Sequence, residues 1–104
     1  MKTYQGKICD RGAGPQIILI SDKGKSYYLK HMVRHSPDGF NWGYEGSGPA
    51  DTALSILTDC LGKEQANHLY QPFKRAFVAG WGNEFSITEK EIKDWTEEQL
   101  KEPK

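Results

Sequence analysis

The sequence predicts a single α+β domain in which an N-terminal antiparallel sheet of two or three strands packs against two or three C-terminal helices. Within the first thirty residues, short apolar and aromatic runs alternate with glycine-containing turns, which is typical of strands. From Pro49 onward, apolar residues recur at the three- and four-residue spacing of a helix. The 104 residues contain no linker or repeat, so we expect one domain over residues 1–104.

Three strands are expected in the N-terminal third, at "TYQGKI", "QIILI" and "SYYLK". In the intervening "SDKGK", Asp22 suits a tight turn through its side-chain bond to the backbone, and Gly24 suits it through positive φ. The run "IILI" is rich in β-branched residues without alternation, which predicts the central and best-buried strand. In the third strand Tyr27 and Tyr28 would lie on opposite faces, one buried and one exposed.

The clearest predicted helix begins at Pro49, which suits the first helical position, and ends before Gly62, which suits the residue after a helix. Its apolar side consists of Ala50, Ala53, Leu54, Leu57, Cys60 and Leu61. Its polar side consists of Asp51, Thr52, Ser55, Thr58 and Asp59. We therefore expect the apolar side to pack on the sheet and the polar side to face solvent.

A second helix is expected in "KEQANHLYQ", with Pro72 either interrupting it or opening a further turn. Residues 73–78 fit a helix or a strand, and we favour the helix. The third helix is indicated by Thr88 and Glu91, which have the spacing of a capping box. Ile87 and Ile92 have the spacing of a hydrophobic staple across its start, and residues 100–104 are polar enough to fray.

Between Lys30 and Gly48 the regular pattern fades, and loops this long are uncommon in small domains unless they pack or function. Phe40, Trp42 and Tyr44 alternate along this segment, so in extended backbone they would share one face. That face either fills the core or forms a stacking platform for a planar ligand. A domain of this size needs its aromatic residues for burial, which favours the core.

Gly43, Gly46 and Gly48 precede the first helix and suggest either a phosphate-binding loop or a structural turn into the helix. The segment has neither the lysine of a P-loop nor the glycine order of a dinucleotide fold. Asp51 would lie in the first helical turn, where its carboxylate would take the N–H bonds that an anion needs. We therefore expect a structural turn.

Metal and nucleophile motifs are weak. His31 and His35 have zinc-binding spacing, but Met32 stands where a metalloprotease would have its catalytic glutamate, and Pro37 argues against a helix. His35, Ser36 and Asp38 are the residue types of a hydrolytic triad, yet adjacency in sequence is not triad geometry. We expect His35 to order the loop through hydrogen bonds, and we expect no metal, cofactor or catalytic residue.

The charge balance is neutral, with 14 basic and 14 acidic residues, so bulk electrostatics favour neither nucleic acid nor a membrane surface. The longest apolar run, "IILI", is far shorter than a membrane span, and the N-terminus lacks a signal-peptide core. Cys9 and Cys60 lack CxxC spacing and are interpreted as partly buried free thiols. These features predict a cytoplasmic protein.

Taken together, "HSPDGFNWGYEGSGPADTALSIL", with "TYQGK" before it and "QPFKRAFV" and "ITEKEIKDW" after it, resembles a small family of bacterial and phage domains of unknown function. The resemblance covers nearly the whole chain, and the WGYxGSGPA segment is its specific part. It implies a stand-alone domain from a bacterium or a mobile element. It implies no reaction, cofactor or catalytic residue.

Two functions are compatible with these observations. The favoured one is a non-enzymatic interaction protein that binds a macromolecule, with protein favoured over nucleic acid, through the Asp38–Ser47 loop surface. The alternative is a small-molecule or nucleotide-binding domain, with or without hydrolytic activity, that uses the glycine-rich loop and the aromatic residues. The candidate binding residues are His35, Asp38, Trp42, Tyr44, Glu45 and Ser47. A concave apolar site where Ser47 and His35 converge would favour the alternative, and a protruding loop would favour the first function.

Overall fold

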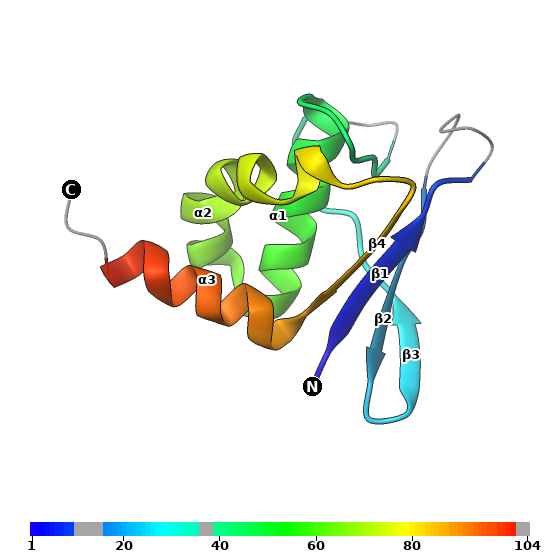
Figure 1. Cartoon of the computed structure of the whole chain (residues 1–104), viewed down its shortest axis with the longest axis horizontal. Coiled ribbons are helices and arrows are strands. Elements are labelled where there is room, and N and C mark those ends of the chain that lie inside the picture. The colour runs from blue at the N-terminus through cyan, green and yellow to red at the C-terminus, as the bar shows by residue number, and fades with distance from the viewer. Residues whose placement is uncertain (10–15, 36–38, 102–104) are drawn as a thin grey trace.

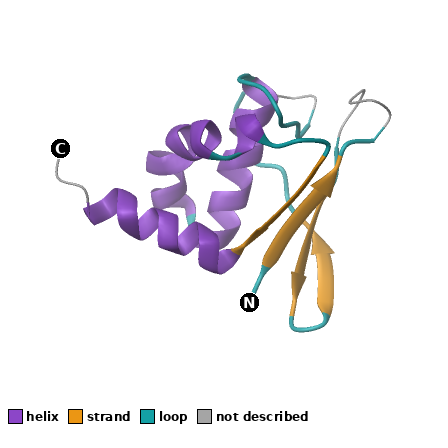
Figure 2. Cartoon of the chain, in the orientation of Figure 1, coloured by secondary structure: helices purple, strands orange, loops and turns teal. Residues whose placement is uncertain are grey.

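The computed structural model describes residues 1–9, 16–35 and 39–101 and confirms the α+β fold class. One sheet lies beside a group of helices, and the helices cover one face of the sheet (Figures 1 and 2). The elements in chain order are β1 (Thr3–Lys7), β2 (Ile18–Asp22), β3 (Lys25–Tyr28), α1 (Ser47–Leu61), α2 (Lys63–Ala76), the 3₁₀ helix η2 (Val78–Gly80), β4 (Glu84–Thr88) and α3 (Glu89–Lys101). The sheet therefore has one strand more than the sequence analysis predicted.

All neighbouring strands are antiparallel, in the order β3-β2-β1-β4. The additional strand, β4, comes from the C-terminal part of the chain and pairs Ile87 with Tyr4 of β1. Phe85 and Ile87 alternate with exposed residues along β4, so a period-two signal was present in "EFSIT". Its pairing with β1 brings the two ends of the chain together, which no local pattern indicates.

The β2–β3 turn has the predicted backbone, since Gly24 has a φ of 81° and Lys23 a φ of 50°. The burial of β2 agrees with the prediction of the best-buried strand, because it lies between β1 and β3 and none of its five residues is exposed. Ile18 and Ile20 are buried, whereas Ile17, which immediately precedes the strand, is exposed, because helices cover only one face of the sheet. Within "IILI", full burial is therefore limited to the face that the helices cover.

Both tyrosines of β3 are exposed, Tyr27 by 43% and Tyr28 by 69%. The expectation that one of them would be buried was wrong. β3 forms the edge of the sheet, at the end opposite β4, so it has a neighbouring strand on one side only.

Helix α1 is the central helix, and it lies between α2 and the sheet (Figure 1). It begins at Ser47, two residues before the predicted start, and Leu54 and Leu57 are buried as expected. Every residue from position 48 to position 57 is buried. The predicted solvent-facing side was therefore wrong for Asp51, Thr52 and Ser55, which face a loop of the chain instead of water.

Helix α2 continues through Pro72 to Ala76, so Pro72 neither interrupts it nor opens a separate turn. The favoured helix is correct for Phe73–Ala76, and Val78 begins η2. Gly62, with a φ of 94°, separates α1 from α2 at the position predicted for the end of the first helix.

The capping box of α3 is present. The N–H of Glu91 donates to Thr88 Oγ1 over 3.1 Å, and the N–H of Thr88 donates to Glu91 Oε1 over 3.0 Å. Ile87 and Ile92 are both buried next to this cap. Leu100 and Lys101 are still helical, and residues 102–104 of the predicted frayed end lie outside the described residues.

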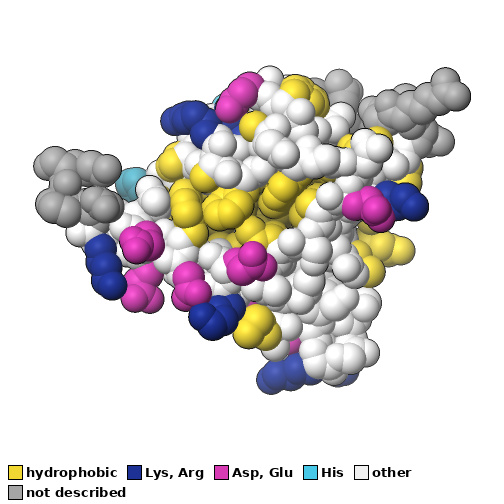
Figure 3. All heavy atoms as spheres, in the orientation of Figure 1, with side chains coloured by type: hydrophobic (Ala, Val, Ile, Leu, Met, Phe, Trp, Pro, Cys, Tyr) yellow, Lys and Arg dark blue, Asp and Glu magenta, His cyan; other side chains and the backbone are white. Residues whose placement is uncertain are grey.

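Apolar side chains form a band on the face shown in Figure 3, bordered by charged side chains of both signs. Rings of Phe73, Phe77 and Trp95 contact one another between α2 and α3, with centroids 5.1 to 5.9 Å apart. These contacts attach α3 to the core. Across the part of the chain that the structure describes, no helix is both long and apolar enough to cross a membrane.

Candidate interaction surface

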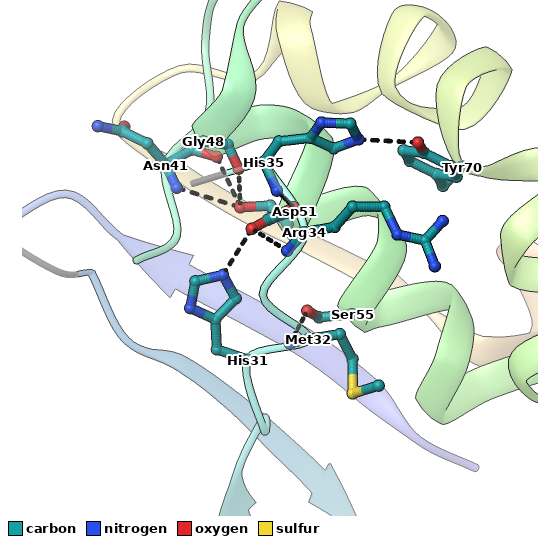
Figure 4. Close-up of polar contacts among 10 residues, drawn as sticks. His31, Met32, Arg34, His35, Asn41, Gly48, Asp51, Ser55 and Tyr70 are labelled. Atoms are coloured by element: carbon teal, nitrogen blue, oxygen red, sulfur yellow. Dashed lines mark hydrogen bonds and ion pairs between the residues drawn. The ribbon is translucent and has the colours of Figure 1, made fainter. Parts of the chain in front are cut away.

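Asp51 anchors the segment that follows β3 to the centre of α1. Its side chain is fully buried, and Oδ1 accepts the N–H of His35 over 2.9 Å. Oδ2 accepts the N–H of Arg34 over 3.1 Å and lies 2.9 Å from Nε2 of His31 (Figure 4). The predicted capping role was wrong, because Asp51 lies beyond the first turn of a helix that starts at Ser47.

Two further polar side chains of α1 bind the same loop. Ser55 Oγ accepts the N–H of Met32 over 2.8 Å. Thr52 Oγ1 accepts the N–H of Asn41 over 3.1 Å, and its hydroxyl lies 2.7 Å from the Asn41 carbonyl oxygen. Asp51, Thr52 and Ser55, which we call the α1 polar side, thus hold both arms of the loop through its backbone. Such satisfied buried polar groups fix a loop in one conformation.

His35 is exposed at the end of the first arm, and its ring contacts α2. Nε2 lies 2.8 Å from the hydroxyl of Tyr70, and the two rings stack with centroids 5.8 Å apart. The guanidinium of Arg34 lies over the Tyr70 ring, 5.9 Å from its centroid. It also donates a hydrogen bond to the side chain of Asn67. His35 therefore orders the loop by its ring as well as by its backbone.

Trp42 and Phe40 belong to the core. Trp42 is 3% exposed, its Nε1–H donates to the Gly82 carbonyl over 3.0 Å, and its ring meets Phe85 edge-on with centroids 4.8 Å apart. The core interpretation is therefore correct for these two residues, and neither can serve as an exposed stacking platform. Trp42 remains important to the candidate surface only as an anchor for the residues that follow it.

Tyr44 is different, because 47% of its surface is exposed. The backbone beside it is closely packed: a Cβ at Gly48 would lie 2.8 Å from Asn41 Cβ, and one at Gly46 would lie 2.7 Å from the Tyr44 ring, which would have to shift. Gly43 has a φ of 90°. The glycines thus form a tight structural turn into α1, and Tyr44 packs along that turn with one side in solvent.

Glu45 and Ser47 are exposed on either side of Gly46. The carboxylate of Glu45 lies 3.0 Å from Nζ of Lys74, one helical turn after Tyr70 on α2. His35 and Glu45 therefore contact the same stretch of α2. We call His35, Tyr44, Glu45 and Ser47 the loop surface; Asp38, the remaining candidate, lies outside the described residues, as does Ser36.

The α2 contacts of this surface were missed by the sequence analysis. Tyr70 and Lys74 lie far along the chain from the loop surface, and neither stands in a motif. Arg34 adjoins His35 in sequence, but no pattern indicates its contact with Tyr70. The only available signal was the i, i+4 spacing of Tyr70 and Lys74, which places them on one helix face.

Two hollows lie elsewhere on the described part of the molecule. One, of about 620 Å³, is on the outer face of the sheet and is lined by residues of β1, β2 and β4 together with Cys9 and Ile17. The other, of about 180 Å³, lies between Leu29–Met32 and α1. Neither of these two hollows is lined by Ser47 or His35.

The N-terminus of α1 carries no side-chain cap and no acidic residue in its first turn. The objection to an anion site that rested on Asp51 therefore does not hold. Pro49 still removes one N–H donor, and the exposed carboxylate of Glu45 lies two residues before the helix.

A second polar cluster ties the N-terminus to the helices. The hydroxyl of Tyr4 donates to Asp59 Oδ1 over 2.7 Å, and Nζ of Lys2 lies 2.9 Å from the same oxygen. Burial and then the bond to Asp59 raise the pKa of Tyr4, and the bond to Asp59 raises the pKa of Lys2. These groups satisfy one another, which indicates a structural role.

Both cysteines are free thiols, but only one is partly buried. Burial raises the pKa of Cys60 to about 11, so its thiol is protonated at neutral pH. Cys9 is exposed, so the expectation of two partly buried thiols was wrong for it.

Residues 4–98 match the model of a family of unknown function, DUF6166. The match spans most of the chain, and the chain belongs to this family. No curated protein and no solved structure matches it.

Proposed function

We propose that this DUF6166 chain is a non-enzymatic interaction protein that binds a protein partner through the loop surface. The observation that carries the proposal is the attachment of the loop backbone to the α1 polar side, centred on the buried Asp51. A loop already held in one conformation loses less entropy on binding than a flexible one. The side chains on this loop can therefore bind a partner with little further loss of conformational entropy.

The chemistry of the loop surface suits a protein partner. Tyr44 offers a half-exposed aromatic ring with a hydroxyl, and tyrosine is enriched at protein interfaces because it combines apolar area with a polar group. Glu45, Ser47 and His35 supply a polar periphery. The chain as a whole carries no excess of positive charge, which disfavours a phosphate backbone as the ligand.

We also propose that the protein acts in the cytoplasm and that it comes from a bacterium or a mobile element, where its partner would be a host protein. Two free cysteines support a reducing compartment, because exposed thiols such as that of Cys9 persist where disulfides do not form.

The experiment is affinity capture from a lysate of the organism that encodes the chain, with quantitative mass spectrometry. We expect one or a few proteins to be enriched on the native chain and to be lost with Tyr44→Ala and with Glu45→Gln. Leu100→Ala and Lys90→Ala, exposed on α3, are matched controls that keep the enrichment. Far-UV circular dichroism and urea unfolding establish that each variant is folded.

Enrichment that is equal for the native chain and for Tyr44→Ala contradicts the proposal. The alternative nucleotide-binding function has its own readout in a thermal-shift panel of nucleotides. A nucleotide-induced shift that disappears in a folded Ser47→Pro variant would support the alternative function instead of the proposed one. The reason is that proline lacks the backbone N–H that Ser47 provides at the start of α1.

A further inference from the structure

Strand β3 has an unpaired edge. It is the last strand of the sheet, and all four of its residues are exposed. In a two-residue hairpin the residues that flank the turn, here Asp22 and Lys25, exchange backbone hydrogen bonds. Bonding then alternates along the strand, so the N–H and C=O groups of Ser26 and Tyr28 point away from β2.

The next inward bond confirms this alternation. The N–H of Leu29 donates to the Ile18 carbonyl over 2.9 Å, which continues the ladder one residue beyond β3. Beyond the β2–β3 ladder, no backbone bond between described residues involves Ser26 or Tyr28. Two donors and two acceptors therefore remain available at the spacing that an added strand requires.

Exposed aromatic rings flank this edge on both faces of the sheet. Tyr28 lies on the outer face beside Leu19, its cross-strand partner, and Tyr27 lies on the opposite face, where Nζ of Lys2 is 6.0 Å from its ring centroid. A strand added next to β3 would place side chains against a tyrosine on each face.

The charge around the edge is positive. Lys23, Lys25 and Lys30 are exposed, and none of them forms an ion pair with a described residue. Two acids lie near the edge: Asp22 is paired with the N-terminal amine over 3.3 Å, and Asp59, which lines the same hollow as Lys30, is paired with Lys2 over 2.9 Å. An incoming segment would therefore meet uncompensated positive charge.

We propose that β3 is a docking edge that takes an extended acidic segment of a protein partner as a fifth strand of the sheet. Main-chain bonds to Ser26 and Tyr28 hold the segment, and its acidic side chains pair with the lysines. A second copy of the chain is a poor occupant, because its own β3, Lys25–Tyr28, contains no acidic residue that could pair with the lysines. This edge is separate from the loop surface, and the inference does not depend on the proposed function.

The test uses a phage-displayed library of random peptides of about ten residues, the upper range of strand length. We expect selection on the native chain to enrich proline-free peptides in which Asp or Glu alternates with β-branched or aromatic residues. The most enriched peptide, labelled with fluorescein, should bind saturably and should protect the amides of Ser26 and Tyr28 from hydrogen exchange.

Two variants test the main-chain hydrogen bonds and the charge attraction separately. Ser26→Pro removes an outward donor while leaving the β2–β3 ladder intact, as proline is tolerated on an edge strand. Lys25→Glu reverses a charge at the edge, and Lys63→Glu, exposed on α2, is its matched control. We expect each edge variant to weaken binding at least about tenfold, or about 1.4 kcal/mol, and the control to leave it unchanged.

Several outcomes would overturn the inference. They are failure to enrich acidic peptides, equal binding by a proline-substituted peptide of the same charge, and retained binding by Ser26→Pro and Lys25→Glu. Protection of Ser26 and Tyr28 without peptide, increasing with protein concentration, would identify a second copy as the occupant instead. If Ser26→Pro does not fold, the inference is tested by peptide binding to Lys25→Glu and by the hydrogen exchange of the Ser26 and Tyr28 amides.

Discussion

The backbone N–H of His35 donates a 2.9 Å hydrogen bond to Oδ1 of Asp51, and this bond links an exposed loop to the buried centre of α1. Asp51 also accepts the N–H of Arg34 and contacts His31. One carboxylate thus organises five consecutive residues that have no regular secondary structure of their own. The loop surface depends on this arrangement.

Asp51→Asn should destabilise the domain by about 3 kcal/mol, because an amide cannot accept all of these bonds and its NH₂ group would face a donor in a dry site. Urea unfolding measures the loss, and amide exchange at Arg34 and His35 should accelerate. Asp94→Asn, which is exposed and paired with Lys90 on the same helix, should change stability by less than about 0.5 kcal/mol. A loss of only about 0.5 to 1 kcal/mol for Asp51→Asn would instead match a helix-capping role.

Leu57→Ala should reduce the free energy of unfolding by about 2 to 5 kcal/mol, because Leu57 is fully buried on the central helix. The matched control is Leu100→Ala, since Leu100 is exposed near the end of α3. A loss below about 0.5 kcal/mol for Leu57→Ala would show that α1 is not the centre of the core.

Thr88→Ala should cost about 1 kcal/mol of stability, because it removes the oxygen that accepts the N–H of Glu91 in the capping box. Binding through the loop surface should be unaffected, since the cap lies at the junction of β4 and α3. Loss of partner capture by a folded Thr88→Ala protein would contradict this separation of roles.

Glu89 makes stability depend on pH at the acidic end. A hydrogen bond from the Lys2 N–H, followed by the interaction with Lys93, lowers the pKa of Glu89 below its usual value. The folded state therefore favours the carboxylate, so this stabilisation is present above the unfolded pKa of about 4.3 and is lost as pH falls through the folded value. The difference in stability between the native chain and Glu89→Gln should be present at neutral pH and should shrink in acid. A difference that is constant with pH would exclude this linkage, and Glu98→Gln, exposed on α3, is the control.

Features with local signals could be predicted from the sequence. Gly24 marked the hairpin turn, Gly62 marked the end of α1, and the spacing of Thr88 and Glu91 marked the start of α3. In each case the physical cause lies within four residues, so the sequence pattern contains it.

Features that depend on distant contacts could not be predicted in this way. Asp51 has the sequence position of a helix-capping residue, and only its contacts 16 to 20 residues away along the chain reveal its role. Trp42 and Tyr44 are chemically similar and two residues apart, yet Trp42 is buried against Gly82 and Phe85 whereas Tyr44 remains half exposed. Burial of this kind is decided by the packing of β4, and no local sequence pattern indicates where that strand pairs.

The most direct test of the proposed function places a photo-crosslinking residue, p-benzoylphenylalanine, at position 44 of the chain in cells of the organism that encodes it. We expect a discrete protein adduct on irradiation, because Tyr44 is half exposed on the loop surface, and we expect the adduct to weaken with Glu45→Gln. The same residue at position 90, exposed on α3, should give no such adduct. Absence of a discrete adduct at position 44, or identical adducts from both positions, would contradict the account.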